Sequence, residues 1–191
     1  VSRDAGRTWK TYVPAGHDGP AFTAVAFGPT GRGVLASGGL LLVSADWGVT
    51  WGPPLYAGAS PDRAVNDIAL RGANAVAVGD GGMIFSSSDA GATWIREASP
   101  VSAALTSVAL AADGTAVAGT EDGDVLVRTL EWVAAGSAGA PVTAVSAVAT
   151  PVWTDGLPDL FAATDHDVLG SDDGQTFASL PGLPDLSGAS W

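Results

Sequence analysis

The sequence predicts an all-β fold, a β-propeller built of four-stranded antiparallel blades. Three observations predict it. An eight-residue pattern, S-x-D-x-G-x-T-W, recurs with its glycines at positions 6, 48 and 91, and a period of about 40 to 45 residues is typical of propeller blades. Stretches that alternate apolar with small or polar residues precede the motifs, as half-buried strands do. No stretch has the pattern of an amphipathic helix of useful length.

Each repeat contains four short strands, A to D, in order. The A strands are the alternating stretches at 22–27, 65–70, 105–110 and 142–147. In the second repeat, strands B and C are 75–78 and 83–85, and they are joined by 79–82 with the sequence Gly-Asp-Gly-Gly. Asp-Gly between apolar stretches is a strong hairpin signal. The repeated motif is then the C–D turn, and strand D follows it, as at 93–97.

These landmarks divide the chain into blades at 22–57, 65–99, 105–136 and 142–181. Residues 1–14 are expected to end an earlier blade with a D strand, and 186–191 to begin a further blade with an A strand. The blade at 105–136 has a degenerate motif at 128–132 that keeps little more than Trp132. Strands A and D of one blade do not touch, so the two ends cannot pair. The sequence therefore predicts a segment of a larger propeller, whose remaining blades come from flanking chain or another copy.

Composition and charge exclude several classes of partner. Hydrophobic residues make up 47% of the chain and charged residues 15%, a balance opposite to that of disordered chains. Twenty acidic residues against eight basic ones give a net charge of -12, which argues against a nucleic-acid footprint and against an anionic membrane surface. No apolar run approaches the length of a membrane span. The absence of Cys excludes disulfides, thiolate metal ligands and Cys nucleophiles.

The motif residues have a structural interpretation. Asp accepts hydrogen bonds from backbone N–H groups of its own turn, Ser does so more weakly, and Gly supplies a left-handed backbone angle. The aromatic residue packs between blades. Because a catalytic group is needed only once, repetition in every blade argues against catalysis. The residues expected in this structural role are Ser2, Asp4, Gly6, Thr8, Trp9, Ser44, Asp46, Gly48, Thr50, Trp51, Ser87, Asp89, Gly91, Thr93, Trp94, Asp172, Gly174, Thr176 and Phe177.

The motif S-x-D-x-G-x-T-W is identified as the Asp-box, or BNR repeat, and the chain resembles that superfamily over nearly its whole length. Residues 78–85 leading into 87–94 are most similar to the repeat of photosystem II stability and assembly factors. Sialidases and xyloglucan-cleaving glycosidases carry the same box, so the box marks a blade and does not mark a chemistry. Because proteins of this superfamily are commonly exported, the resemblance implies an extracytoplasmic or secreted location.

The resemblance also implies that ligands prefer the propeller face formed by the D–A connections and the B–C turns. An acidic rim on this face would hold a cation or a basic partner, although Asp and Gly are also simply good hairpin residues. The stretches 122–124 and 165–167 have the spacing of calcium ligands without the longer series that ends in Glu. We therefore expect no cofactor, with calcium as the alternative. The candidate residues are His17, Asp18, Asp62, Arg63, Asp80, Glu121, Asp122, Asp124, Asp165, His166 and Asp167.

The sequence gives little support for an enzyme. Sialidases of the superfamily bind their substrate with three arginines, and only Arg63 is expected on the ligand face. A two-carboxylate glycosidase would use a pair such as Asp80 and Asp122, but most Trp residues belong to the boxes, which leaves few for a saccharide platform. The assembly-factor type works as a scaffold, through a basic patch that this chain lacks. We expect no catalytic and no metal-ligating residue.

The function expected from the sequence is a non-catalytic binding or assembly scaffold for a protein or saccharide partner. Two alternatives remain open. One is a glycoside hydrolase with catalytic residues partly outside this stretch, and the other is a structural module of a surface protein.

Overall fold

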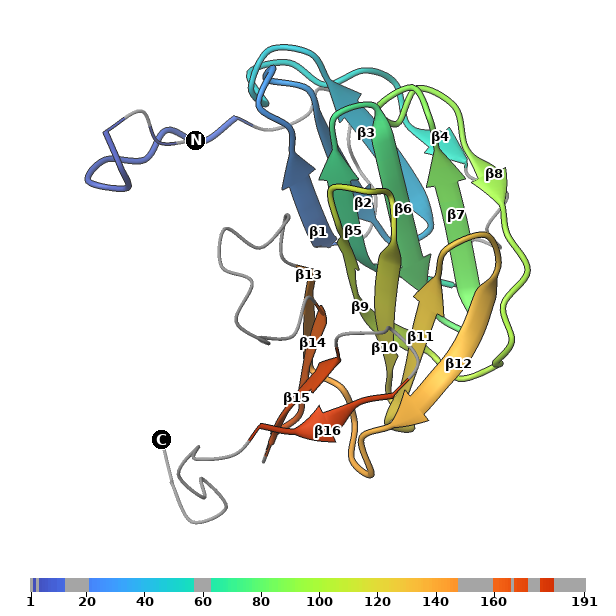
Figure 1. Cartoon of the computed structure of the whole chain (residues 1–191). Helices are drawn as coiled ribbons and strands as arrows, with labels where there is room; N and C mark the ends of the chain where they lie inside the picture. Colours follow the sequence, from blue (N-terminus) through green and yellow to red (C-terminus); the bar gives the residue numbers. More distant parts are fainter. Residues whose placement is uncertain are drawn as a thin grey trace.

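The computed structural model of the 191-residue chain describes residues 2, 4–12, 21–56, 63–147, 160–165, 167–171 and 176–180. These residues contain sixteen β-strands and no helix, and so no helix among them is long and apolar enough to cross a membrane. The strands form four sheets, each of four antiparallel strands in sequence order (Figure 1). The predicted all-β fold of four-stranded blades is confirmed.

The blades are numbered 1 to 4 along the chain. Blade 1 contains β1 (Phe22–Phe27), β2 (Gly33–Ser37), β3 (Leu40–Ser44) and β4 (Leu55–Tyr56). Blade 2 contains β5 (Val65–Arg71), β6 (Asn74–Gly79), β7 (Met83–Ser87) and β8 (Ile95–Arg96). Blade 3 contains β9 (Leu105–Leu110), β10 (Ala116–Thr120), β11 (Asp124–Arg128) and β12 (Trp132–Ser137). Blade 4 contains β13 (Ala144–Ala147), β14 (Leu160–Ala163), β15 (Val168–Ser171) and β16 (Ala178–Ser179).

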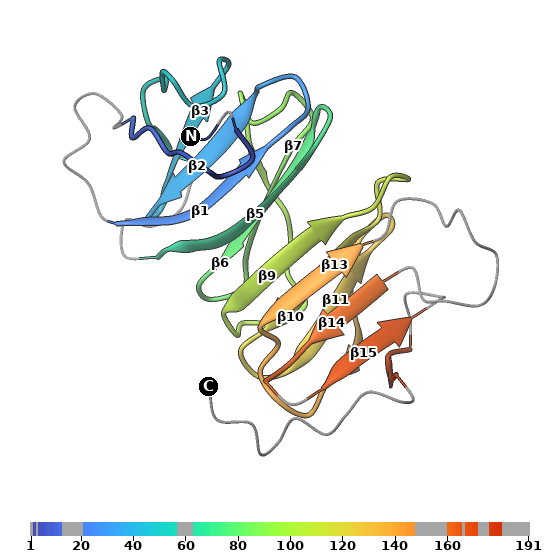
Figure 2. The ribbon, with the colours of Figure 1, turned by 90° about the vertical axis from the view of Figure 1, so that its left-hand side faces the viewer.

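The first strands of the blades lie side by side. Strand β1 contacts β5, β5 contacts β9, and β9 contacts β13. Figure 2 shows β1 next to β5 and β9 next to β13, with the other strands of each blade further out. Sheets stacked side by side with their first strands innermost are the arrangement of blades in a β-propeller.

The hydrophobic core lies between the blades rather than within one of them. Each blade has a forward face toward the next blade and a back face toward the preceding one. Between blades 1 and 2, Val34 and Leu41 on a forward face meet Ile68 and Phe85 on a back face, and all four are at most 5% exposed. Comparable apolar layers lie between blades 2 and 3 and between blades 3 and 4. Burial between blades therefore provides most of the apolar stabilisation.

The innermost strands are also joined by a repeated hydrogen bond. The second residue of each of three inner strands donates its side chain to the backbone oxygen of the first apolar position in the next blade. Thr23 donates to Val65, Asn66 to Leu105 and Thr106 to Val142. These bonds fix the register of one blade against the next.

The D strand of blade 2 is shorter than the sequence predicts, and the first motif turn is not followed by a strand within residues 4–12. In blade 2 the expected strand at 93–97 is reduced to Ile95–Arg96. Among residues 4–12 the structure has the first motif turn and no strand. A strand forms where its N–H and C=O groups find a neighbouring strand, and no C strand precedes this turn in the part of the chain that is described. Residues 186–191 lie outside the described residues.

Candidate functional site

The S-x-D-x-G-x-T-W turns are closed by their own side chains. In blade 2, Ser87 Oγ donates to Asp89 Oδ1 (2.8 Å) and accepts the N–H of Gly91 (2.8 Å). Asp89 Oδ1 accepts the N–H of Thr93 (2.8 Å), and its Oδ2 accepts the Thr93 hydroxyl (2.6 Å). The same bonds recur in the turns at 2–8 and 44–50. Asp172 and Gly174, from the fourth copy of the motif, lie outside the described residues.

Two successive residues of each turn have a left-handed backbone. In blade 2 these are Ala90 (φ 58°) and Gly91 (φ 88°), and the other two turns have the same pair of angles. Positive φ at both central residues is the geometry of a type I′ hairpin turn. The role of the motif glycine is thus as predicted. The left-handed angle of the residue before it was not evident from the sequence, because Ala and Trp rarely adopt this angle.

Hydrogen bonding sets the protonation of the motif carboxylates. The Thr93 hydroxyl, followed by the Thr93 N–H, lowers the pKa of Asp89 to about 2. The equivalent contacts from Thr8 lower the pKa of Asp4 to about 2, and those from Thr50 lower the pKa of Asp46. Both oxygens of each carboxylate accept bonds from the turn itself. These groups therefore hold the turn, as the structural interpretation predicts.

The B–C turns and the D–A connections lie on one face, as expected. Gly82 N donates to Ala103 O (2.9 Å), and Ala138 N donates to Gly123 O (2.7 Å). At Gly82 a Cβ would lie 2.1 Å from the Val101 carbonyl oxygen, so only glycine admits this approach. These two contacts place the described D–A connections of blades 2 and 3 beside the B–C turns.

Two carboxylates of this face are tied to the backbone beside them. Asp80 Oδ2 accepts the N–H of Ala64 (2.9 Å), and its Oδ1 accepts an N–H of Asn66 (3.1 Å). Glu121 Oε1 accepts the N–H of Ala104 (2.9 Å) at the equivalent place in blade 3. Each carboxylate thus fastens a B–C turn to the start of the inner strand of its own blade. The geometry gives them a structural task that the sequence did not indicate.

The other described candidates make separate contacts or are exposed. Arg63 is exposed and donates to Gly81 O (3.2 Å). Asp122 and Asp165 are exposed, and Asp124 is partly buried. Asp167 Oδ1 accepts the N–H of Val168, and its Oδ2 accepts the Ser179 hydroxyl. Of the remaining candidates, His17, Asp18, Asp62 and His166 lie outside the described residues. Within the described ranges no three His, Asp or Glu side chains are grouped so as to hold a metal ion.

The degenerate motif of blade 3 builds a different turn. Arg128 occupies the strand position that Ser87 occupies in blade 2, since it pairs with Ala116 as Ser87 pairs with Ala75. Trp132 pairs with Arg128 across the turn and takes the place of the motif Trp in the core between blades 2 and 3. Only residues 129–131 separate the two, whereas 88–93 separate Ser87 from Trp94. The turn is shorter, and a long cationic side chain replaces a buried hydroxyl.

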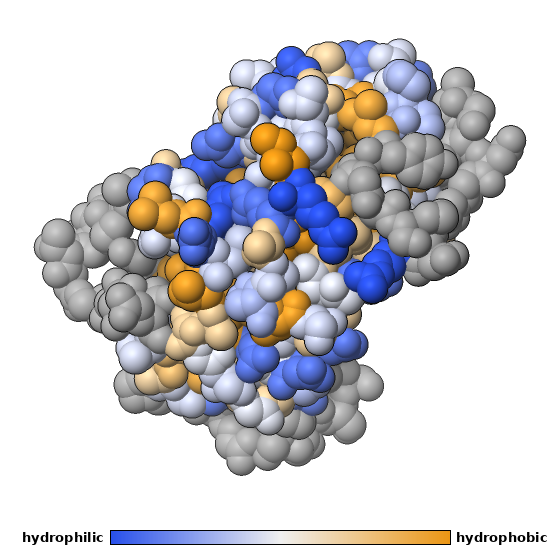
Figure 3. All heavy atoms as spheres, turned by 90° about the vertical axis from the view of Figure 1, so that its right-hand side faces the viewer, coloured by the Kyte–Doolittle hydropathy of each residue, from blue (hydrophilic) through white to orange (hydrophobic). Residues whose placement is uncertain are grey.

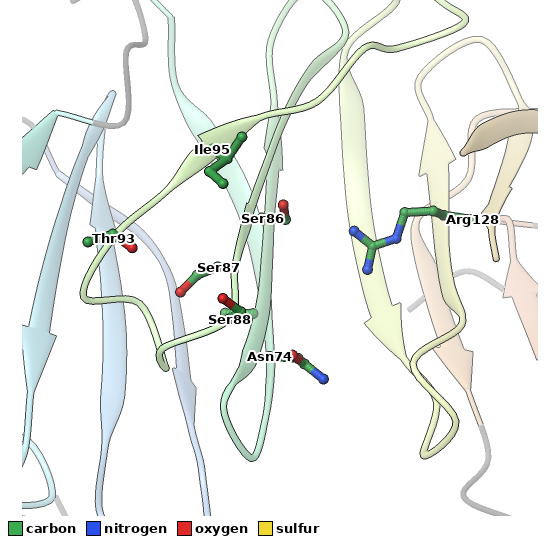
Figure 4. A pocket seen from close by; sticks show the side chains of 8 residues that line it. Asn74, Ser86, Ser87, Ser88, Thr93, Ile95 and Arg128 are labelled. Atoms are coloured by element: carbon green, nitrogen blue, oxygen red, sulfur yellow. The ribbon is translucent and has the colours of Figure 1, made fainter. Parts of the chain in front are cut away.

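A polar pocket of about 300 Å³ lies between blades 2 and 3 beside this turn. Figure 4 shows Arg128 extending from β11 toward blade 2, where Ser86, Ser88 and Asn74 face it. The full lining is Asn74, Ala75, Ser86, Ser87, Ser88, Thr93, Ile95 and Arg128. The pocket therefore presents a guanidinium group, hydroxyls and an amide within one opening.

The guanidinium is oriented by blade 2. Arg128 Nη1 donates to Glu97 Oε1 (2.7 Å), and Trp132 Nε1 donates to Glu97 Oε2 (2.5 Å). The Arg128 guanidinium also lies 5.5 Å from the Trp132 ring centroid, within the range of a cation–π contact. Arginine carries five N–H donors, and one of them forms a hydrogen bond within the part of the chain that is described. This site was not predicted from the sequence, although Arg128 in the degenerate motif is a visible departure from the repeat.

Comparisons with known proteins place the chain among β-propellers. No family model matches the sequence, and no curated protein matches it. The computationally designed Ika8 protein matches with a TM-score of 0.64 and 18% identity, over 91% of this chain and 53% of that one. YCF48 bound to D1 peptide matches with a TM-score of 0.63 and 18% identity, over 84% of this chain and 54% of YCF48. The designed Ika4 protein matches with a TM-score of 0.61 and 16% identity, over 91% of this chain and 98% of Ika4. The chain spans about half the length of the first two, and at these identities the likeness establishes the fold.

Proposed function

We propose that this chain is a non-catalytic Asp-box β-propeller, which binds a polypeptide segment of a partner and acts as a scaffold. The observation that carries the proposal is the contrast between two sets of polar residues. The repeated Asp residues, Asp80 and Glu121 are engaged by the fold itself. The pocket beside Arg128 is open, and only one of the five donors of Arg128 is bonded within the described residues, to Glu97. The hydrogen-bonded turns support Asp-box membership, and with it a secreted or extracytoplasmic location.

The pocket favours a group rich in hydrogen-bond acceptors. The free donors of Arg128 and the hydroxyls of Ser86 and Ser88 match the side chain of Asn, Gln, Asp or Glu, or a terminal carboxylate. A propeller of similar shape has been captured with a peptide, namely YCF48 with D1 peptide, which supports a polypeptide as the class of partner. The net charge of -12 would steer toward the protein a segment that is basic elsewhere along its length.

The test is selection of a phage-displayed library of random dodecapeptides on the immobilised 191-residue chain. We expect enriched peptides whose affinity, measured by fluorescence anisotropy, falls about tenfold or more in Arg128→Met, in line with about 1.5–3 kcal/mol for a charged hydrogen bond. Arg32→Met, which changes an exposed arginine in blade 1, should bind as well as the wild type. If Arg128→Met does not fold, Ser88→Tyr obstructs the pocket from an exposed position. A library without enrichment, or equal binding by the pocket variants, would refute the proposal.

The rival function, glycoside hydrolysis, requires one carboxylate to act as acid and another as base or nucleophile. In Asp80, a member of the candidate pair, both oxygens accept bonds from the chain, which supports the non-catalytic proposal. A panel of chromogenic glycosides and sialosides is expected to remain intact. Turnover that Asp80→Ala or Asp122→Ala abolishes would establish the hydrolase instead.

A further inference from the structure

The pocket beside Arg128 contains three polar side chains that the fold does not use. Asn74, Ser86 and Ser88 line it, and their side chains form no hydrogen bond within the part of the chain that is described. Asn74 and Ser88 are exposed, and Ser86 is partly buried. A side-chain amide and a hydroxyl can each donate and accept. The pocket therefore offers acceptors as well as donors.

The other two hydroxyls of the lining are already engaged by a carboxylate. Ser87 Oγ donates to Asp89 Oδ1 at 2.8 Å, and Thr93 Oγ1 donates to Asp89 Oδ2 at 2.6 Å. These contacts and the Thr93 N–H lower the pKa of Asp89 to about 2, so this group is ionised at neutral pH. One wall of the pocket is thus backed by a fixed negative charge.

The positive charge in the lining is already balanced. Arg128 is the only charged residue among the described residues that line the pocket. Glu97 Oε1 accepts its Nη1–H at 2.7 Å, and the side chains of the two residues are only 17% and 25% exposed. The charged groups that belong to the lining or bond to it are Arg128, Glu97 and Asp89. Together they leave one negative charge in excess.

This balance separates two ligands of nearly the same shape. A carboxylate would add a second uncompensated negative charge beside Glu97 and Asp89, on a chain whose net charge is -12, and like charges repel. A primary amide adds no charge. Its oxygen can accept from the unbonded N–H groups of Arg128, and its NH₂ group can donate to Asn74 Oδ1 or to a serine hydroxyl.

A saccharide is the other neutral ligand that is rich in hydrogen-bonding groups, and the lining does not favour it. The only carbon side chains in the lining are those of Ala75 and Ile95, so the described lining has no aromatic ring on which a sugar could stack. Figure 3 shows the side of the molecule that lies on the right in Figure 1, where β8 and β12 run. Hydrophobic residues there form small separate patches among hydrophilic ones.

We propose that the pocket binds the primary amide of an Asn or Gln side chain in the partner segment and discriminates against Asp and Glu. Glu97 sets this preference because it holds the Arg128 guanidinium in place and neutralises its charge. The specificity rests on the proposed function, in which the same pocket binds a polypeptide. It narrows the ligand from any acceptor-rich group to an uncharged one.

The first test is a titration of the ¹⁵N-labelled 191-residue chain, followed by nuclear magnetic resonance at pH 7 and constant ionic strength. The probes are the N-acetyl, N-methylamide derivatives of asparagine, aspartate, glutamine and glutamate, whose caps carry no primary amide. We expect the Arg128 Nε–H and Asn74 side-chain signals to shift with at least one amide probe, which should bind about fivefold more tightly than its acid counterpart. Tighter binding of the acid, or no shift with either amide, would overturn the proposal, and so would tighter binding of methyl α-glucoside.

The second test changes the charge balance. Glu97→Gln leaves Arg128 and Asp89 to compensate each other, so the variant should lose the preference for the amide or prefer the acid. Asp122→Asn is the matched control, since it removes one negative charge at an exposed side chain outside the pocket lining and should keep the wild-type ratio. An unchanged ratio in Glu97→Gln would contradict the role of Glu97. If that variant does not fold, the wild-type titration decides alone.

The outcomes also separate this inference from the proposed function. Capped amides that bind the pocket, together with a dodecapeptide library that gives no enrichment, would support the inference and refute the proposed function. Enriched peptides that need Asp or Glu at the position sensitive to Arg128→Met would support the proposed function and refute the inference.

Discussion

Asp89 shows how the repeat works at the level of one side chain. Its carboxylate is exposed to water, yet it accepts hydrogen bonds from the hydroxyls of Ser87 and Thr93 and from the backbone N–H of Thr93. Gly91 completes the turn with φ 88°, and its α-carbon lies so close to blade 1 that a Cβ would be 2.5 Å from Val34 Cγ2. The motif therefore shapes its own turn and also fits that turn against the preceding blade.

The first residue-scale prediction concerns acid stability. The pKa of Asp89 lies at about 2, below its ordinary value of 3.8. A carboxylate with a depressed folded-state pKa stabilises the fold above the unfolded value, and this contribution is lost as the pH falls from about 4 toward 2. Asp89→Asn should therefore melt lower at pH 7, and its melting temperature should depend less on pH between 4 and 2. Calorimetry across this range measures both effects. Asp122→Asn, at an exposed carboxylate, should follow the wild-type curve.

The second residue-scale prediction compares two glycines. Gly72 has φ 61° and would place a Cβ in open space, whereas Gly91 combines φ 88° with the contact to Val34. Gly72→Ala should cost about 1 kcal/mol, the cost of a left-handed alanine. Gly91→Ala should cost about 2–4 kcal/mol, because overpacking adds to the backbone term. Urea denaturation measures both, and equal losses would show that the contact with blade 1 is unimportant.

At the scale of strands and turns, blade 3 departs from the repeat and still forms a blade. Its shortened turn keeps Trp132 in the core, while Arg128 pairs with Glu97, the residue that directly follows the D strand of blade 2. Blade 3 therefore lacks the hydrogen bonds that the motif forms within its own turn, and it has instead an ion pair between blades 2 and 3. The pocket beside Arg128 is the geometric result of that difference.

The link between blades 2 and 3 can be measured by a double-mutant cycle. The side chains of Arg128 and Glu97 are 17% and 25% exposed, so the pair is partly shielded from solvent. Glu97→Gln and Arg128→Met should each destabilise the protein, and the double variant should lose less than the sum. We expect a coupling of about 1 kcal/mol from urea denaturation, within the range for residues in contact. Additive losses would mean that the two side chains do not interact in solution.

A further element-scale prediction concerns the two carboxylates that the sequence paired as a catalytic candidate. Asp80→Ala leaves the Ala64 N–H without its acceptor and should cost about 1–3 kcal/mol of unfolding free energy. Asp122→Ala, at an exposed side chain, should change stability by less than about 0.5 kcal/mol. Thermal and urea unfolding of both variants distinguish a structural Asp80 from one that is free to act on a ligand. Equal stabilities would contradict the structural role.

The strand positions could be predicted because two sequence patterns, apolar alternation and hairpin residues, mark strands and turns along the chain. Alternation marked the inner strands, and Asp-Gly marked the hairpin at Asp80. The sequence could not show that Asp80 and Glu121 fasten neighbouring strands, since the donors at Ala64 and Ala104 are backbone groups brought near by pairing. It also could not show the pocket at Arg128. That pocket depends on the space between two blades, and no pattern within one blade encodes it.

At the scale of the whole molecule, four sheets stack in chain order. The main contacts between sheets join consecutive blades only: β1 with β5, β5 with β9 and β9 with β13. Blades 2 and 3 are each covered on both faces, while blade 1 is covered on its forward face and blade 4 on its back face. The repeat predicted this order from the sequence. It did not show that the face bearing Phe22 and Phe27 is exposed, because exposure depends on which blades pack against each other.

Because each blade contacts only the blades next to it, the blades are expected to unfold locally at different free energies. In a linear array, each unit is held by its own stability and by its couplings to the units beside it, so the end units open at the lowest free energy. Amide protons of β6 and β10, in the two blades with neighbours on both sides, should exchange with solvent most slowly, and those of β14 among the fastest.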